Sequence, residues 1–508
     1  MSSTANRVIK NTGYLYAKMG ITMFVSLYTT RLILNSLGAS DFGIFNIVGG
    51  AIAMLGFLNA AMASATQRFM SYSEGEGDKE KQKSIFNVSL ILHLGISLVV
   101  GIVLFIAGYF FFNGILNIPA DRIFAAKVVY GSLIVSTMFT VMTVPYDAAM
   151  NAHENMKYYA IVGIFESFLK LVVAFVCVYT IYDKLIVYGI LMACIPLVTL
   201  AIMWVYCHKH YKECVIAPHV YWQKGLMKEM TSFAGWNFFA TASTMISNYG
   251  LGIAINIFYG VCLNTALGIA QQVDAQLKVF SNNMLKAVNP IITKKEGSKE
   301  TQAMLTITMS SSKFSFYMFS FFVIPFFIEM PYILELWLKK TPEYSLLFCR
   351  MQLICSLFGQ LGATLNSAIS ASGKIRKFSF YSSLLYMGSL LLTYIFFKLK
   401  MPPYFMYISI FLLNVVLYRL LGVIVLHKNS GLRYQEYLRN VVRPCIIITL
   451  VCFVLSYMST FILEVSLLRV VITSIVSSVT FILCLFTIGM TAEEKLQMQY
   501  WIKAIINK

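Results

Sequence analysis

Charged residues are scarce in this sequence: Asp, Glu, Lys and Arg make up 12% of its 508 residues, and apolar residues make up 58%. A soluble domain averages about 25% charged and about 45–50% apolar residues. So little charge could not cover a water-exposed surface of this size, which excludes a soluble enzyme. The high apolar content also excludes a disordered chain, a collagen and a coiled coil. The composition therefore predicts a protein surrounded mostly by lipid.

Several chemical motifs are missing as well. No phosphate-cradling Walker motif occurs, which excludes an ATPase within the chain, and no convincing Ser/His/Asp set points to an enzyme. The ten cysteines are scattered singly and form no readable disulfide framework. One metal-like spacing, Cys207-His208-x-His210 with Cys214, stands at a helix end without a second cluster, so we expect no metal site.

Hydrophobic runs long enough to cross a membrane, about 20 residues each, recur fourteen times along the chain. We therefore expect an all-α integral membrane protein, because β-barrel strands would be shorter and would alternate in polarity. The expected spans cover residues 12–36, 42–66, 85–112, 124–149, 158–181, 185–206, 233–258, 263–288, 305–329, 345–371, 378–397, 404–426, 442–462 and 467–489.

Basic residues outnumber acidic ones, 40 to 22, and those in the loops lie mostly on one side. One set of loops and ends holds 24 Lys and Arg residues. The opposite set holds six, which are Arg122, Lys184, Lys339, Lys340, Lys398 and Lys400. Loops rich in Lys and Arg stay in the cytoplasm. We therefore expect both termini in the cytoplasm and no nucleic-acid partner, and we expect the Glu/Lys run 74–83 to be a solvated loop.

An internal repeat organises the spans. Gly13-Tyr14-Leu15-Tyr16 heads the first span and Gly235-Trp236-Asn237-Phe238 the seventh, at an offset of 222, while the EGDKE at 76–80 matches the EGSKE at 296–300. We therefore expect a six-helix lobe at 1–220, a second at 221–430 related to it by a pseudo-twofold axis along the membrane normal, and two extra helices with a tail at 431–508. Two such lobes predict a central cavity that opens to alternate sides.

Polar residues recur on one face of several expected spans. On a helical wheel, Thr22 and Ser26 share a face with Lys18. At the repeat offset of 222, Thr22 corresponds to Thr244 and Ser26 to Asn248. Hydrogen bonding between helices is the simpler explanation, but the recurrence in both lobes favours a polar lumen. The full set is Thr22, Ser26, Asn237, Thr241, Thr244, Asn248, Gln271 and Asn282.

Inside the expected spans, basic residues outnumber acidic ones. Each costs about 2.5–3.5 kcal/mol at a helix centre, so each needs a partner or a function. A cationic lumen favours an anionic cargo, and its candidate residues are Lys18, Arg31, Lys170, Lys278 and Arg419. Candidate proton or cation sites are Asp147, Glu166 and Asp274. Glu166–Lys170 and Asp274–Lys278 are each one turn apart and could equally be structural pairs, and Arg31 could snorkel to the outer surface.

Three segments resemble a known family. They are TRLILNSLGASDFGIFNIVGG at 30–50, SATQRF at 64–69 and VPYDAAMNAHENMKYYA at 144–160. They are similar to the polysaccharide (O-antigen- or capsule-type) flippases of bacterial cell-surface glycan pathways, a branch of the multidrug/oligosaccharidyl-lipid/polysaccharide (MOP) exporter superfamily, whose members are MATE-like. This resemblance covers the first half strongly and the second by length and span count.

The resemblance implies a two-lobed bundle that moves undecaprenyl-diphosphate-linked oligosaccharides between the leaflets of the inner membrane. Its implied partners are the lipid-linked oligosaccharide, membrane lipid and the polysaccharide polymerase machinery. Its implied driving ions are H⁺ or Na⁺, with no other cofactor. The alternative is a cation-coupled multidrug and toxin exporter of the same superfamily. Those exporters typically carry an acid in the first helix, where this chain has Lys18 and Arg31.

Overall fold

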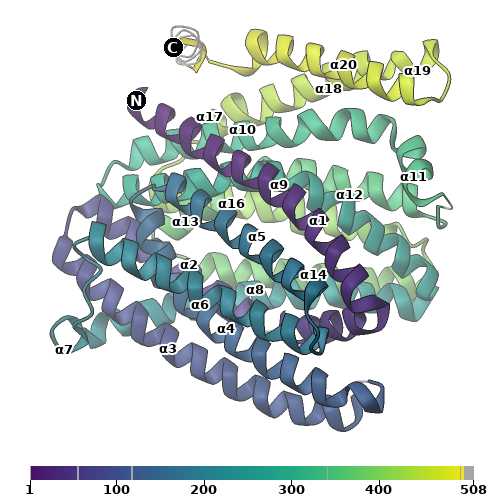
Figure 1. Cartoon of the computed structure of the whole chain (residues 1–508). Helices are drawn as coiled ribbons and strands as arrows, with labels where there is room; N and C mark the ends of the chain where they lie inside the picture. The colour runs from purple at the N-terminus through teal and green to yellow at the C-terminus, as the bar shows by residue number, and fades with distance from the viewer. Residues whose placement is uncertain (1, 54–55, 116–117, 340, 492–493, 497–508) are drawn as a thin grey trace, which may run out of the picture. The chain divides into compact units, whose positions relative to one another are not determined.

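The structure is a computed structural model that describes residues 2–53, 56–115, 118–339, 341–491 and 494–496. Across these ranges the regular structure is helical, and no β-strand occurs (Figure 1). Lipid offers no hydrogen bonds to the backbone, and a helix satisfies its own N–H and C=O groups internally. The expected all-α class is confirmed.

The chain forms two compact units. The first, called the N-terminal unit, comprises Asn11–Phe238 and Gly297–Lys299. Within it, α4 packs against α2, α3 and α6, and α5 packs against α6. Its helices are α1 (Ser2–Ala53), α2 (Gly56–Glu76), α3 (Lys79–Phe110), α4 (Ile123–Ala152), α5 (Met156–Tyr179), α6 (Lys184–His210), α7 (Pro218–Tyr221) and the first part of α8 (Lys224–Tyr259), with a π-helical turn at Phe111–Ile115 and a 3₁₀ turn at Ala120–Arg122.

The C-terminal unit comprises Phe239–Glu296 and Glu300–Lys508, with the first ten residues. Here α10 packs against α12, α18 and α20. Its further helices are α9 (Val261–Gly297), α10 (Thr301–Ile328), α11 (Met330–Leu338), α12 (Ser345–Gln360), α13 (Leu365–Ala371), α14 (Arg376–Lys398), α15 (Phe405–Ser409), α16 (Tyr418–Ser430), α17 (Tyr434–Tyr437), α18 (Arg443–Tyr457), α19 (Ser459–Ile462) and α20 (Leu467–Cys484), with π-helical stretches at Ile410–Leu417, Leu438–Val442 and Leu485–Gly489.

Ten helical segments of the described residues are long and apolar enough to span a membrane, and α12 with α13, bent by 42°, makes an eleventh. The count of fourteen is therefore not confirmed. The three remaining expected spans, 12–36, 42–66 and 263–288, are helical within α1, α2 and α9. The first and third carry polar residues such as Lys18 and Asp274 that lower their hydropathy. The second is divided between α1 and α2 on either side of residues 54–55, which lie outside the described residues, as do Lys340, Lys503 and Lys508 of the loop count.

Local sequence sets several helix ends. Asp78, Asn155 and Asp183 each accept a hydrogen bond from a backbone N–H in the first turn of the helix that follows. Short polar side chains favour this position because they satisfy amides that the helix leaves free. Gly38 ends the first expected span inside α1 with φ 76° and ψ 170°, a conformation that other residues rarely adopt.

Candidate functional site

Lys18 occupies a notch between α1 and α5 in the N-terminal unit. Its Nζ lies 4.2 Å from the centre of the Tyr159 ring, a distance that permits a cation–π interaction. Gly163, one turn further along α5, leaves the space that the end of the lysine side chain fills, because a Cβ at residue 163 would overlap it. The half-buried lysine is therefore held against an electron-rich ring.

The other residues of the predicted N-terminal stripe differ in exposure. Thr22 is half-buried and donates to the carbonyl of Met19 at 3.1 Å, so its own helix already satisfies its hydroxyl. Ser26 and Arg31 are exposed. On α8, the Asn237 amide donates to the Ser64 hydroxyl at 3.4 Å.

The predicted acid of α5 has its expected partner. Glu166 lies 2.6 Å from Lys170 Nζ, with both side chains partly exposed. Asp147 is half-buried on α4. These distances fit either a structural pair or a coupling site.

In the C-terminal unit, Asp274 of α9 is nearly buried, with 8% of its side chain exposed. It accepts hydrogen bonds from Lys278 at 2.7 Å and from Gln352 of α12 at 3.0 Å, both at Oδ2. The sequence predicted the first contact and missed the second, because Gln352 lies 78 residues away in the chain. Asn282, one turn beyond Lys278, is exposed.

Arg419 lies at the bend between α12 and α13. Its Nη1 donates to the carbonyl of Gly362 at 3.2 Å, and its Cδ would lie 2.5 Å from a Cβ at that position. The hydroxyl of Tyr437 donates to the neighbouring carbonyl of Leu361. A helix break frees carbonyl groups, and here a guanidinium and a phenol satisfy two of them.

A pocket of about 390 Å³ opens between α8 and α9, near their connecting turn. Two residues of the predicted stripe, Asn248 and Gln271, line it. So do two further carboxamides, Asn256 and Asn264, and the ring of Tyr249. No charged side chain lines this pocket. The other stripe residues of α8, Thr241 and Thr244, lie outside its lining, and Thr244 donates to the carbonyl of Ala240 at 3.0 Å.

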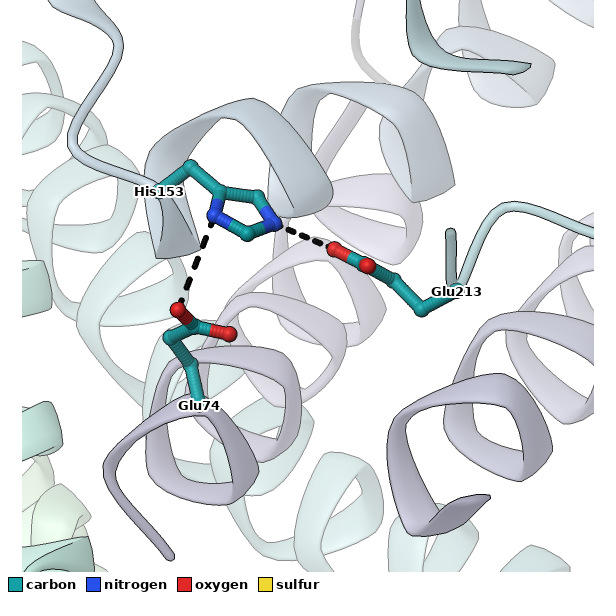
Figure 2. Close-up of side chains that lie close together, drawn as sticks. All are labelled: Glu74, His153 and Glu213. Carbon is teal, nitrogen blue, oxygen red and sulfur yellow. Dashed lines mark hydrogen bonds and ion pairs between the residues drawn. The ribbon is translucent and has the colours of Figure 1, made fainter. Parts of the chain in front are cut away.

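A polar cluster joins the end of α2 to the segments that follow α4 and α6 in the N-terminal unit (Figure 2). His153, just after α4, has Nδ1 at 3.6 Å from Glu74 Oε1 and Nε2 in contact with Glu213 Oε1. The sequence predicted the run 74–83 as a solvated loop, which is wrong for most of the run, because α2 continues to Glu76 and α3 begins at Lys79. The Glu74 side chain is only 14% exposed, and Gln82 is buried. The cluster was also missed because its three members are far apart in the sequence.

Glu74, His153 and Glu213 are the group within the described ranges whose metal-ligating atoms come within 4.8 Å of one another. The two carboxylates face different nitrogens of the ring (Figure 2). The three side chains are nevertheless close enough together that they could hold a metal ion. Of the sequence motif Cys207-His208-x-His210, His210 instead stacks on the ring of Tyr206.

Three further charge networks were missed, although two of them carry a signal in the sequence. Arg122 forms ion pairs with Asp41 and Asp183. In the C-terminal unit, Lys313 pairs with Glu494 at 2.6 Å and Arg469 with Glu329 at 2.9 Å. Lys313 and Arg469 fall inside expected spans, and an unexplained charge within a span is itself the signal that a partner exists.

Comparison with known proteins identifies the fold. The family model described as MatE matches residues 17–176. MATE in its bent conformation gives a TM-score of 0.72 at 15% identity, over 84% of this chain and 97% of that one. An outward-facing multidrug resistance MATE transporter of the MOP superfamily gives 0.68 at 15% identity, over 83% and 96% of the two chains.

A MOP superfamily transporter from Pyrococcus furiosus, described as having a binding pocket of reverse polarity, gives a TM-score of 0.67 at 14% identity, over 84% of this chain and 96% of that one. No curated protein sequence matches significantly. At these identities the likeness shows the fold alone. The resemblance is thus confirmed at the level of the MATE and MOP superfamily fold, while the flippase branch stays a prediction.

Proposed function

We propose that this protein is a membrane transporter, without enzyme activity, that flips undecaprenyl-diphosphate-linked oligosaccharides across the bacterial cytoplasmic membrane by alternating access. The observation that carries the proposal is the placement of Lys18, a cation enclosed by a glycine and a tyrosine in a fold shared with MATE and MOP transporters. Enclosing a charge is costly. A negatively charged cargo that binds in each transport cycle gives a reason for a lysine at position 18.

A diphosphate that leaves water needs compensating positive charge, and charge-assisted hydrogen bonds to phosphate are stronger than neutral ones. Lys18 and Arg31 in the N-terminal unit, with Lys278 and Arg419 in the C-terminal unit, supply that charge on polar helices. Lys170 is partly exposed beside Glu166 and adds a weaker contribution. Several separate cations suit a cargo that has to leave again, because no single contact then holds it tightly.

The pocket between α8 and α9 supports a glycan as the rest of the cargo. Each carboxamide of Asn248, Asn256, Asn264 and Gln271 offers both a donor and an acceptor, which match the hydroxyl groups of a sugar. Tyr249 adds a ring face. The absence of charge from this lining favours a neutral sugar portion over a second charged group.

The alternative is a cation-coupled drug exporter of the same superfamily. The reverse polarity described for the Pyrococcus furiosus transporter indicates that pocket charge differs among proteins with this fold. Coupling in either case would use H⁺ or Na⁺ at Asp147, Glu166 or Asp274. Of these, Asp274 is the most enclosed and is held by two donors. The proposed partners are lipid-linked oligosaccharide, membrane lipid and the polymerase machinery that uses the product.

Complementation of a flippase-deficient bacterial strain tests the proposal. We expect Lys18→Glu to abolish surface glycan and Lys18→Arg to retain part of it, with membrane levels equal by blot. Lys209, an exposed lysine in the last turn of α6, offers a matched control, and Lys209→Gln should export normally. If glutamine at positions 18, 170 and 278 together still supports normal glycan export, the anionic-cargo mechanism is wrong. Extrusion of cationic dyes by the same protein would favour the exporter.

A further inference from the structure

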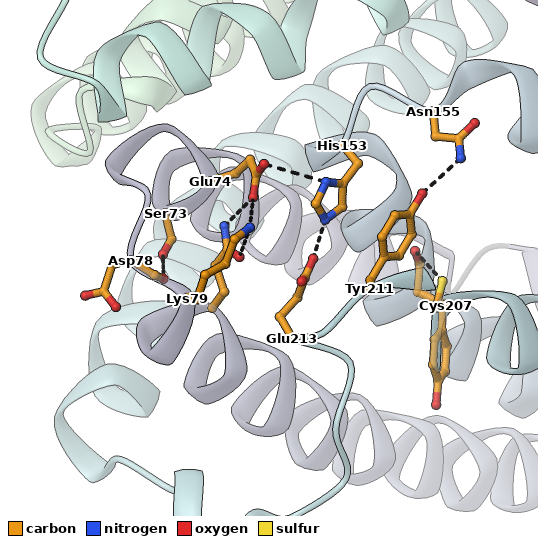
Figure 3. Close-up of polar contacts among 11 residues, drawn as sticks. Ser73, Glu74, Asp78, Lys79, His153, Asn155, Cys207, Tyr211 and Glu213 are labelled. Carbon is orange, nitrogen blue, oxygen red and sulfur yellow. Dashed lines mark hydrogen bonds and ion pairs between the residues drawn. The ribbon is translucent and has the colours of Figure 1, made fainter. Parts of the chain in front are cut away.

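Glu74, His153 and Glu213 come together from three distant places in the chain of the N-terminal unit. Glu74 lies in the last turn of α2, His153 directly follows α4, and Glu213 follows α6 (Figure 3). One ligand atom from each residue lies within 4.8 Å of the others. We propose that this cluster binds a divalent transition-metal ion such as Zn²⁺, with His153 Nδ1 and Glu74 Oε1 as ligands and Glu213 holding the other edge of the ring. This inference does not depend on what the protein transports.

The distance between the two proposed ligand atoms suits an ion between them. Nδ1 of His153 lies 3.6 Å from Oε1 of Glu74, which is too long for a hydrogen bond. Imidazole nitrogen and carboxylate oxygen bind Zn²⁺ at about 2.0–2.2 Å, so two such ligands at a tetrahedral or trigonal angle lie about 3.4–3.6 Å apart. An ion can therefore bridge the ring and the carboxylate without a large movement of either side chain.

Glu213 determines which nitrogen of the ring faces the ion. Its Oε1 contacts Nε2 on the edge of the imidazole away from Glu74 (Figure 2). A carboxylate there accepts a hydrogen bond from Nε2–H, and the neutral imidazole then presents its lone pair at Nδ1. Histidines that bind metals commonly donate their other N–H to a carboxylate in this way. The side chain of Glu213 is 3% exposed, so little water reaches this contact.

Glu74 is held through its other oxygen. Its Oε2 accepts hydrogen bonds from Lys79 Nζ at 2.8 Å and from Gln82 Nε2 at 2.6 Å, while Oε1 faces the ring (Figure 3). Burial raises the pKa of Glu74, but these hydrogen bonds and the neighbouring charges outweigh burial, so that the pKa is lowered and the carboxylate stays ionised. Two carboxylates and one ammonium leave a net negative charge around a neutral ring, and this charge attracts a cation.

The imidazole is fixed in position by its own surroundings. α4 ends in a tight turn, in which the N–H of Asn155 donates to the carbonyl of Met150 at 3.0 Å and Glu154 has φ 56°. The ring of His153 stacks on the ring of Tyr211, with centroids 4.2 Å apart and an interplanar angle of 10°. Asn155 also donates to the Tyr211 hydroxyl at 3.0 Å. A ligand that is already oriented loses little conformational freedom when it binds, which favours affinity.

The ligand types select the ion, and its position gives it a structural consequence. Mg²⁺ and Ca²⁺ prefer oxygen ligands, whereas an imidazole nitrogen suits Zn²⁺ and other first-row transition metals. The carbonyl of Gly75, beside Glu74, accepts a hydrogen bond at 2.8 Å from Ser298, a residue of the same unit. Ion binding would therefore stiffen this end of the N-terminal unit as far as the turn between α9 and α10.

Zn²⁺ binding by the full-length protein in lipid nanodiscs tests the site. The protein would be stripped with a chelator, which is then removed, and titrated with Zn²⁺ in competition with a chromophoric chelator. We expect this binding to be lost in Glu74→Gln and in His153→Phe, which keeps a ring to stack but offers no nitrogen. Glu213→Gln should weaken it about 10–100-fold, because the ring loses its charged partner. His219→Phe, at an exposed histidine of α7, should bind like the unmodified protein.

Two measurements on the unmodified protein do not depend on how the variants fold. With Co²⁺ in place of Zn²⁺, the absorption spectrum should lack thiolate-to-cobalt charge transfer, because no cysteine is a ligand. Hydrogen–deuterium exchange in peptides covering 72–80, 151–157 and 211–216 should slow severalfold when Zn²⁺ is added. The proposal is overturned if the unmodified protein binds no more Zn²⁺ than a folded His153→Phe variant. It is also overturned if thiolate absorption appears and binding is lost in Cys214→Ser, or if Zn²⁺ leaves exchange in all three peptides unchanged.

Discussion

A glycine and a lysine in different helices depend on one another in the N-terminal unit. Gly163 has no side chain, and the end of Lys18 lies where a Cβ would be. We expect Gly163→Ala to displace the lysine from the Tyr159 ring. The flexible end of a lysine can move at little cost, so the stability of the protein should change by less than about 1 kcal/mol. Surface glycan should nevertheless fall severalfold, measured in the complementation assay.

A matched control for this substitution lies on α1. Gly20 has nothing within 4 Å of the position that its Cβ would take, so Gly20→Ala should export normally. Equal export by both alanine variants would mean that the position of Lys18 is unimportant.

Single residues also show which contacts the sequence could not predict. Polarity inside an apolar run identified Lys18, Asp274 and Arg419, because a charge in lipid is conspicuous. The sequence could not give their surroundings, since Gly163, Gln352 and Gly362 contact these residues only after distant helices pack together. The ion pairs Glu166–Lys170 and Asp274–Lys278 were easier to predict, because the two residues of each pair lie one helical turn apart.

At the level of elements, a buried ion pair joins α20 to the end of α10. Glu329 is fully buried and accepts from Arg469 at 2.9 Å and from Thr473 at 2.9 Å. Removing one partner of a buried pair costs about 3–5 kcal/mol, because the other charge is left uncompensated. We therefore expect Arg469→Met to lower the free energy of unfolding by that amount, measured by denaturation of the purified protein.

The double variant Glu329→Gln with Arg469→Met removes both charges and should lose much less stability. Arg439→Met, at an exposed arginine, should change stability by no more than about 0.5 kcal/mol. A double variant as unstable as the single one would show that the charge pair is not the cause.

Helix existence was more predictable than helix shape. Eleven expected spans coincide with long apolar helices, counting the bent pair as one. The bend itself was not predicted, because its break is stabilised by Arg419 and Tyr437, which come from later helices. Of the three expected spans that are not among these helices, 12–36 and 263–288 carry polar faces, and 42–66 is divided between α1 and α2.

For the whole molecule, the division of basic loops predicts the orientation in the membrane. In a protein lacking other reactive thiols, cysteines placed at 81, 224 and 377 should react with a membrane-impermeant reagent only after the cells are opened. A cysteine at 184 should react in intact cells. Reaction of position 224 from outside would contradict the predicted orientation.

The two charge pairs of the C-terminal unit also have a consequence for synthesis. Lys313 and Glu329 are made 181 and 140 residues before their partners Glu494 and Arg469. A ribosome that stalls before α20 would leave both charges in the nascent chain without their counterions. Such a chain would be exposed to membrane proteases, whereas the finished chain would conceal both groups. The segment from α20 to Glu494 would thus supply both counterions late in synthesis.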